Sequence, residues 1–374
     1  MNQPRNEASE QLRQHLWLAM VPGVGPLMQR RLLAQYGSPH SVLGASRSEL
    51  QSVQGVGPKL AEAIAQARTQ IDVDEQIQIA RDNRIDILLE SHDEYPPLLQ
   101  EIPDPPAVLF TRGKLLAADR LAVAIVGTRH ASRYGVQQAG RLATSLANAG
   151  ITVVSGMARG IDTAAHRAAL SAGGRTIAVL AGGVLKPYPP ENAALAEEIA
   201  TQGTVLSEAA PYAPPTSGMF PQRNRIISGL TVGTIVVEAA DRSGALITAR
   251  HAWEQNREVF AVPGPVDSRL SNGPHRLIRD GAKLVSSIDD VLEELGPLAH
   301  TAHREDGSTI RVPAEVTLNQ VEKHVLQAIG AEGALIDEVA RASGLPVHRV
   351  LSTISVLEMR SLVRRLAGNR VARA

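Results

Sequence analysis

From position 121 onward, the chain alternates short aliphatic runs with longer segments of helical periodicity. The aliphatic runs are 121–126, 151–154, 176–180, 204–206, 231–237 and 258–262, and the helical segments are 131–149, 163–172, 193–201 and 245–255. Continuous apolar strands that alternate with helices are typical of a parallel sheet covered on both faces. The pattern predicts a doubly wound, Rossmann-like α/β domain over 121–295, in which ligands bind beyond the carboxyl ends of the strands.

Residues 1–82 predict a helical domain that contains two similar turns. The turns are VPGVGP at 21–26 and VQGVGP at 53–58, and each is followed by a helical pattern, 27–36 and 59–67. Such a pair resembles tandem helix-hairpin-helix motifs, whose glycine-rich turns offer backbone N–H groups to a DNA phosphate. The alternative is that these glycines only make tight turns in a SAM-like helical domain. Both interpretations remain open at this stage.

The remaining segments flank the predicted Rossmann-like domain. Residues 83–120 contain proline-rich spacers and are expected to form a transition segment that packs on the core, with short strands at 85–89 and 107–110. Residues 296–316 are expected to be a linker, in which the metal-like spacing of His300 and His303 is incidental.

Residues 317–374 predict a winged-helix domain. Helices are expected at 318–329 and 334–342 and from 347 onward, followed by a hairpin of 362–366 with 369–374. The third helix offers few basic side chains, so contact with a protein is as well supported as contact with DNA.

The loops at the carboxyl ends of the predicted strands carry small residues and arginines. They read GTRHASRYG at 127–135, SGMARGID at 155–162 and SGALIT at 243–248. Small residues let a ligand approach the backbone, and free N–H groups at a helix start favour an anion. Arg129, Arg133 and Arg159 add positive charge, so these loops predict an anion-binding rim.

The segment MFPQRNRIISGL at 219–230 adds two arginines to this rim. Pro221 and Gly229 occupy the positions that favour a helix start and a helix end, which predicts a short helix over 221–228. Helical spacing places Arg223 on the apolar face and directs Arg225 outward. The simplest alternative is that both arginines only form ordinary ion pairs or remain solvated.

Several polar residues have two interpretations. Glu238, at the end of a strand, is either a catalytic carboxylate or a structural counter-ion for Arg223 or Arg225, and the arginine-rich surroundings favour the counter-ion. Asp162 and His166 share a helix face, which suits acid–base chemistry, but a helix cap and a local hydrogen bond are commoner. The sequence contains neither G-x-G-x-x-G after the first strand of this domain nor a P-loop motif.

Composition narrows the possible settings. The 374 residues include no cysteine, which excludes disulfides, thiolate catalysis and cysteine-bound zinc. The polar N-terminus and the lack of an apolar run of about 20 residues predict a cytoplasmic protein without a membrane segment. Lys and Arg total 38 and so do Asp and Glu, so any site for a polyanion has to be a local patch.

The order of these motifs resembles the DNA-processing protein A (DprA/Smf) family of bacterial transformation proteins. The shared motifs are Gly127-x-Arg129 with Tyr134-Gly135, Ser155-Gly156 with Gly160-Ile161-Asp162, and Phe220-Pro221-x-Arg223-Asn224-Arg225, and the similarity spans about 121–290. The resemblance implies a homodimer that binds single-stranded DNA, protects it from nucleases and loads the RecA recombinase. It implies no catalytic reaction, metal or cofactor.

The resemblance also implies a set of DNA-binding residues. They are Gly127, Arg129, Ser132, Tyr134, Gly135, Ser155, Gly156, Arg159, Gly160, Asp162, His166, Lys186, Phe220, Arg223, Asn224, Arg225, Ser243, Gly244 and Thr248. Two other functions stay open. Gly233-Thr234 and Glu238 partly match the motif of nucleotide-monophosphate phosphoribohydrolases, and the domain would also suit a nucleotide-binding sensor.

Overall fold

The core of the protein is a mixed sheet of nine strands, seven of them parallel. The computed structural model describes residues 3–295, 299–303, 309–313, 318, 320–330, 333–359, 362–366 and 368–373. Within this part, the strand order is β1-β2-β6-β5-β4-β3-β7-β8-β9. The strands are β1 Asp86–Leu89, β2 Val108–Gly113, β3 Ala122–Val126, β4 Thr152–Ser155, β5 Thr176–Val179, β6 Thr204–Ser207, β7 Gly233–Val236, β8 Glu258–Ala261 and β9 Lys283–Leu284. The predicted α/β class is confirmed.

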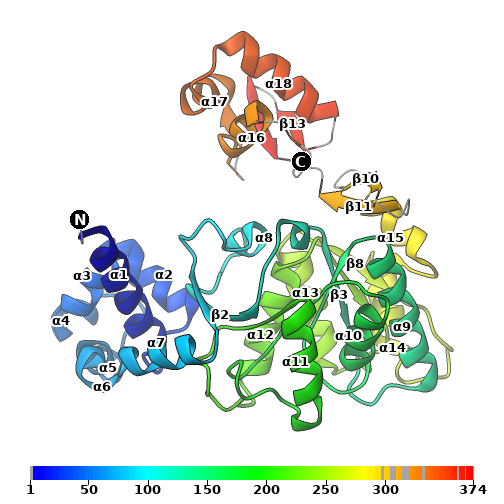
Figure 1. Cartoon of the computed structure of the whole chain (residues 1–374), viewed down its shortest axis with the longest axis horizontal. Coiled ribbons are helices and arrows are strands. Elements are labelled where there is room, and N and C mark those ends of the chain that lie inside the picture. The colour runs from blue at the N-terminus through cyan, green and yellow to red at the C-terminus, as the bar shows by residue number, and fades with distance from the viewer. Residues whose placement is uncertain are drawn as a thin grey trace.

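Helices cover both faces of the sheet because its strands are apolar on both sides (Figure 1). Ile177 and Val179 of β5 face one core, and Ala178 between them faces the other. The first core includes α8 Pro97–Gln100, α12 Met219–Gly229, α13 Gly244–Glu254 and α14 Asn272–Arg279. The opposite face carries α9 Arg133–Asn148, α10 Ile161–Ser171, α11 Ala193–Gln202 and α15 Ile288–Leu295. Two short 3₁₀ turns, Ala117–Arg120 and Pro190–Asn192, complete the domain.

The chain changes direction across the sheet next to β3. From β3 it adds β4, β5 and β6 on one side, and then α12 carries it back so that β7 pairs with the other side of β3. This reversal creates a switch point beyond the carboxyl ends of β3 and β7, where doubly wound sheets bind their ligands.

Strands β1 and β2 belong to the same sheet, which the sequence did not predict. β2 pairs antiparallel with β6, and β1 pairs antiparallel with β2. The segment 83–120 therefore closes one edge of the sheet, and Leu99 and Ile102 from it pack on α12. It is a structural part of the Rossmann-like domain.

A fragment that starts at Leu121 is expected to be much less stable than one that starts at Arg84. The shorter fragment, 121–295, exposes the edge of β6 and removes Leu99, Leu109 and Ile102 from the core. An exposed strand edge also promotes aggregation. Thermal melts and size-exclusion profiles of 84–295 and 121–295 would test this. Equal melting temperatures and equal solubility would show that β1 and β2 contribute little.

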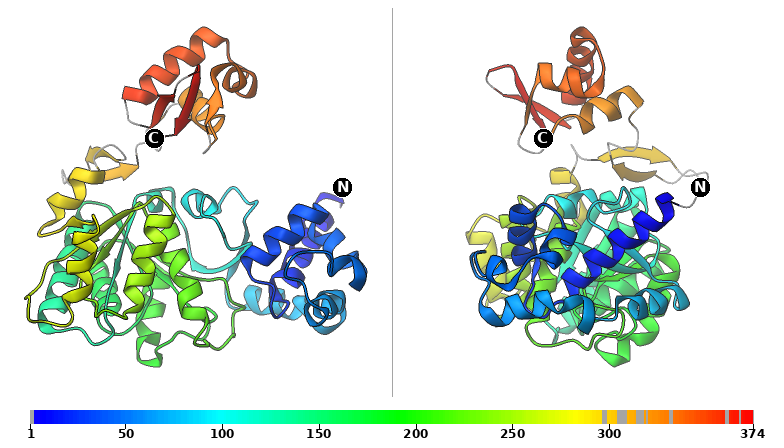
Figure 2. Two further views of the ribbon diagram at one scale, coloured as in Figure 1. Left: turned by 180° about the vertical axis from the view of Figure 1, so that it is seen from behind. Right: turned by 90° about the vertical axis from the view of Figure 1, so that its left-hand side faces the viewer.

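The N-terminal domain lies next to the β1–β2 end of the sheet (Figure 2). Helices α1 to α6 contribute to a small core of their own, and the buried residues of α7 pack on the sheet. The helices are α1 Gln3–Met20, α2 Pro26–Tyr36, α3 Pro39–Gly44, α4 Arg47–Leu50, α5 Pro58–Ala65, α6 Ala67–Gln70 and α7 Val73–Asp82. The two predicted turns have the same geometry, because Gly23 has φ 92° and Gly55 has φ 93°. Both values lie where glycine is strongly preferred.

The predicted linker is wrong in part. Within 296–316, β10 Ala299–His303 pairs antiparallel with β11 Thr309–Pro313. Thr309, Ile310 and Val312 are β-branched, and Asp306-Gly307 between the two strands is a hairpin signal in the sequence. A reading based on glycine, proline and polar content alone overlooked this alternative.

The predicted winged helix is confirmed and stands apart from the sheet in both views (Figures 1 and 2). Its elements are α16 Gln320–Gln327, β12 Ala334–Leu335, α17 Ile336–Ser343, α18 Val347–Met359, β13 Val363–Leu366 and β14 Arg370–Arg373. The strands form a sheet of order β12-β14-β13. Among the described residues, no helix has the length and apolar character to cross a membrane.

Candidate nucleic-acid interface

The switch point opens into a cavity of about 640 Å³. Its walls come from the loop after β3, the first turns of α12 and the segment that leads from β7 into α13. The predicted residues that line it are Gly127, Arg129, Asp162, Phe220, Arg223, Asn224, Ser243, Gly244 and Thr248. Ser243 caps α13 by accepting a hydrogen bond from the Ala245 N–H at 3.3 Å. The Leu246 N–H also bonds to the Ser243 carbonyl, at 3.1 Å. The positive end of the α13 dipole faces the cavity at this wall and favours an anion.

Arg223 forms the floor of the cavity and holds two strand ends together. Its Nη1 donates to the Gly156 carbonyl at 2.5 Å and also to the Val179 carbonyl. Burial lowers the pKa of Arg223 to about 10, partly offset by the nearby Asp162 carboxylate, so the guanidinium stays charged at neutral pH. A side chain at Gly156 would collide with this guanidinium, which explains the glycine.

Asp162 holds the loop that leads from β4 into α10. Its Oδ2 accepts hydrogen bonds from the N–H groups of Gly156 at 3.1 Å and Ala158 at 3.2 Å. The expected helix cap is therefore wrong in detail, because Asp162 bonds to the preceding loop and Gly160 occupies the N-cap position. Burial raises the pKa of Asp162 to about 6, against the opposing effect of Arg223.

His166 lies entirely beneath the surface. Its Nδ1 lies 2.7 Å from the Thr176 hydroxyl, in agreement with the expected local hydrogen bond. Burial, with Arg223 close by, lowers the pKa of His166 to about 3, so the imidazole is neutral. The loop around it would have to open before His166 touched any ligand.

Glu238 does not pair with either arginine, so the predicted counter-ion role is wrong. Its two carboxylate oxygens accept from the Ser132 N–H at 2.9 Å and from the Ser132 hydroxyl at 2.6 Å. Gly135 passes so close that a Cβ there would lie 2.2 Å from the carboxylate. The Glu238 side chain therefore points from the end of β7 toward the β3–α9 loop, and it holds Ser132, the N-cap residue of α9, in place.

Arg225 is buried, which contradicts its predicted outward position. Its side chain is only 4% exposed. The guanidinium bonds to both Glu208 oxygens, at 2.9 and 3.0 Å, and to Asp104 at 3.0 Å. The segment around Asp104 covers the helix face that a helical projection alone leaves open. The expectation failed because it considered α12 in isolation.

The exposed rim of the cavity combines positive charge with aromatic surface. The Arg129 guanidinium lies 5.0 Å from the centre of the Phe220 ring, and Tyr188 meets Phe220 edge-on at 5.9 Å. Arg242 and His130 also line the cavity, and the sequence analysis missed them as site residues. Arg242 immediately precedes the Ser243-Gly244 helix start, a position that could have identified it.

The other predicted residues lie around this rim or beneath it. Arg159 is exposed and pairs with Glu191, next to Gly156 and Tyr188. Lys186 is exposed in the loop before Tyr188.

Three further predicted residues are bonded or packed within the protein. Ser155 is buried and donates to the Ile125 carbonyl at 2.6 Å, and the Tyr134 hydroxyl donates to the Pro263 carbonyl at 2.6 Å. Gly160 closes the β4–α10 loop against Thr128.

Comparison with known families agrees with this architecture. The profile described as DNA recombination-mediator protein A matches residues 86–296, which includes β1, the whole sheet and the cavity. The chain belongs to the DprA/Smf family. The DprA winged helix domain matches 311–369, and a SAM-like helix-hairpin-helix tandem matches 18–68.

Individual relatives extend this assignment along the chain. The protein Smf of Synechocystis sp. is 33% identical over 392 aligned residues, covering 96% of this chain and 98% of the relative. The solved structure of DNA processing protein A from Streptococcus pneumoniae superimposes with a TM-score of 0.65 at 36% identity, covering 75% of this chain and 97% of that one. The structure of the Helicobacter pylori protein, described for its unique single-stranded DNA binding mode, has a TM-score of 0.51 at 31% identity and covers 57% and 95%.

Proposed function

We propose that this DprA/Smf family member binds single-stranded DNA along the rim of the switch-point cavity. The observation that carries the proposal is the cluster of exposed Arg129 and Tyr188 with the half-buried Phe220, beside the N-terminus of α13. Arginine and helix N-termini bind phosphates, and aromatic rings stack on bases of any sequence. The single-stranded DNA binding described for the H. pylori relative supports the same assignment.

The contact set that we propose is smaller than the set expected from the sequence. It consists of the exposed or cavity-lining residues Arg129, Phe220, Asn224, Arg242 and Gly244. Arg159, Tyr188 and Lys186 extend it along the strand. Arg225 and His166 are omitted, since their side chains are buried and bonded within the protein. Arg223 acts on DNA through its buried charge and through the two loops that it holds.

Replacing Arg129 by alanine is expected to weaken binding of oligo-dT about ten- to a hundredfold. Oligonucleotides of other sequence should be affected alike, because the lost contact is to a phosphate. The log–log slope of affinity against salt should fall by about 0.7 for the lost phosphate contact. Fluorescence anisotropy from low to moderate salt measures both. Arg133→Ala is the matched control, because Arg133 is also exposed, at the start of α9 just after this loop, but does not line the cavity. Equal affinities for Arg129→Ala and the unmutated protein would refute the proposed site.

Binding is expected to tighten severalfold as the pH falls from 7 to 5. Burial holds the pKa of Asp162 at about 6, so the carboxylate gains a proton in this range and the cavity becomes more positive by one charge. A bound phosphate disfavours the ionised carboxylate still further, so DNA binding takes up a proton and is favoured by acid. Asp162→Asn should bind with a flat pH profile. The two bonds from backbone N–H groups end on one carboxylate oxygen, which the amide oxygen of asparagine can replace. A His130→Gln background removes the rim histidine from the comparison.

Within this proposal, the protein protects the strand from nucleases and loads the RecA recombinase onto it during transformation, acting as a homodimer in the cytoplasm. Two linked rims would hold one strand with a higher effective concentration than a single rim. The test is RecA filament assembly on DNA already covered by a single-strand-binding protein, with and without this chain. Unchanged assembly would count against loading. Sedimentation that shows only monomers at about 10 μM with DNA present would count against the dimer.

A further inference from the structure

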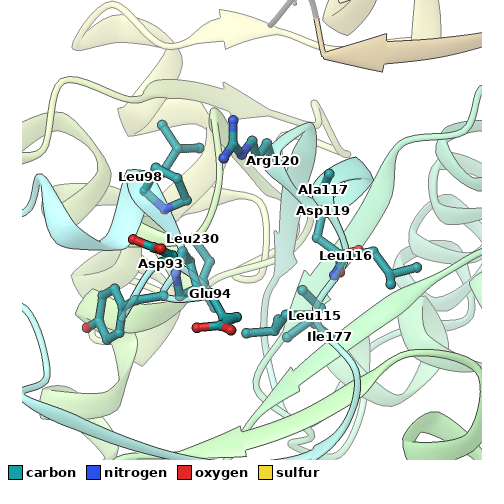
Figure 3. Close-up of a pocket in the computed structure, with 13 residues that line it drawn as sticks. Asp93, Glu94, Leu98, Leu115, Leu116, Ala117, Asp119, Arg120, Ile177 and Leu230 are labelled. Atoms are coloured by element: carbon teal, nitrogen blue, oxygen red, sulfur yellow. The ribbon is translucent and has the colours of Figure 1, made fainter. Parts of the chain in front are cut away.

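A second cavity, of about 200 Å³, lies on the other side of α12, where the N-terminal domain meets the sheet. The first hairpin contributes Gly25 of its turn and Gln29 of α2 to the wall of this cavity, and Glu208, just after β6, lines it as well. Arg223 lines this cavity as well as the larger one. The two cavities therefore flank the same turns of α12. A third, mostly apolar cavity at the amino ends of the strands is lined by Leu115, Ile177 and Leu230 among others (Figure 3). It shares no lining residue with the other two.

Gln29 is the unusual residue of this cavity. It is only 5% exposed, and its Nε2 has no hydrogen-bond partner among the described residues. A buried amide donor without an acceptor is costly, so such groups are normally paired. Helical side chains lean toward the helix N-terminus, and Gln29 stands at the fourth position of α2. Its amide therefore lies near the first turn of α2, whose N–H groups also need acceptors.

The second hairpin provides an internal comparison. Its turn has the same shape, and Pro58 begins α5 as Pro26 begins α2. The position equivalent to Gln29 is Ala61, which is fully buried. The hairpin fold itself therefore does not require a glutamine here. Gln29 is a polar group added where the first hairpin faces the cavity.

The charge balance of the cavity suits an anion. The one acidic side chain that lines it is Glu208, and Arg225 neutralises this carboxylate through two hydrogen bonds. Arg223 and the N-terminus of α2 leave a positive excess. The ligand that satisfies Gln29 and this helix end is a negatively charged acceptor.

We propose that this second cavity, between the first hairpin and the sheet, is a second phosphate site. It holds a backbone phosphate of the same DNA strand that occupies the switch-point cavity. The inference rests on the proposed function and assigns the first hairpin a place on the path of the strand. The strand would cross the first turn of α12, between the two cavities that share Arg223. Short oligonucleotides fill the first site alone, and longer ones reach both.

The test compares Gln29→Glu and Gln29→Ala in the full-length chain. Gln29→Glu keeps the shape and adds a charge that repels phosphate, and Gln29→Ala restores the residue of the sister hairpin. With oligo-dT of about 20 nucleotides, Gln29→Glu should lose at least tenfold in affinity, and its salt slope should fall by about 0.7. With oligo-dT of about five nucleotides, near the lower end of single-strand site sizes, it should bind like the parent. Gln29→Ala should lose less, and only with the long strand.

Gln35→Glu is the charge control, because Gln35 is exposed on the same helix. If it loses as much as Gln29→Glu, the effect is general repulsion and the site is refuted. If both Gln29 variants match the parent at every length, the cavity holds only a buried water and the proposal fails. If the parent itself binds no oligonucleotide, the proposed function fails first, so the two failures are distinguishable. Melting curves of each variant confirm that the comparison concerns folded protein.

Discussion

Arg225→Ala is expected to destabilise the protein by about 3 kcal/mol, because it leaves two carboxylates without their partner in a partly dry environment. Glu208 loses a two-pronged ion pair, and Asp104 loses the contact that fastens its segment over α12. Folded Arg225→Ala protein should bind oligo-dT of about five nucleotides, which fills the switch-point cavity alone, nearly as well as the parent, since this side chain is buried outside that cavity. Longer strands should bind more weakly, because Glu208 in the second cavity is then no longer neutralised. Denaturant unfolding at 25 °C, paired with anisotropy below the melting range, measures the two effects separately.

Two companions sharpen this result. Arg250→Ala removes an arginine that is 65% exposed and that, among the residues the structure describes, pairs with Glu254 on the next turn, so the loss of stability should stay below about 0.5 kcal/mol. Adding Glu208→Gln to Arg225→Ala should recover part of the loss, because the unpaired charge disappears. An Arg225→Ala protein of unchanged stability that has lost DNA binding would reverse our assignment of the side chain.

Gly160→Ala is expected to cost about 3 kcal/mol and to abolish most DNA binding. Gly160 has φ +74°, and a Cβ there would lie 2.4 Å from the carbonyl oxygen of Thr128 and 2.9 Å from that of Arg129. These are backbone atoms, so the loop after β3 must move as a whole, and the positive φ adds strain. Since that loop carries Arg129, the variant should lose affinity even at temperatures where it is fully folded.

Gly173→Ala is the matched control, because Gly173 has φ +70° but faces open space among the described residues. It should show only the conformational strain, about 1 kcal/mol, and normal affinity. If Gly160→Ala were no worse than Gly173→Ala in stability and affinity, the contact between the two loops would not matter.

The strands of the parallel sheet were predictable because each is buried on both faces and is therefore apolar throughout. The runs at 121–126 and 176–180 illustrate this. β9 escaped notice because Lys283–Leu284 is too short to leave a pattern. β1 and β2 were expected as isolated strands, but their pairing with β6 depends on how distant segments meet.

For the site, the sequence identified the right loops and misplaced several partners. Motif order located Arg129, Phe220 and Gly244, which do meet in one cavity. The sequence analysis paired Glu238 with the arginines because its surroundings at the strand end are rich in arginine. The sequence does not show toward which loop the Glu238 side chain points, and in the structure it bonds to Ser132. Arg242 was not predicted, because the motif at this position begins with the Ser-Gly pair that follows it. The ion-pair partners of an arginine such as Arg225 come from distant segments that pack over its helix, and the helical periodicity of the sequence carries no information about them.

The reversal of direction beside β3 sets the order in which a chain emerging from the ribosome can complete this site. β3 forms early and gains β4 as its first neighbour, but its other neighbour, β7, is synthesised only after α12 has been made. Domains fold in the order in which their segments appear. Until Gly233–Val236 has emerged, one side of β3 stays uncovered and the cavity has no second wall. A nascent chain should therefore be unable to capture DNA until most of the Rossmann-like domain has been translated.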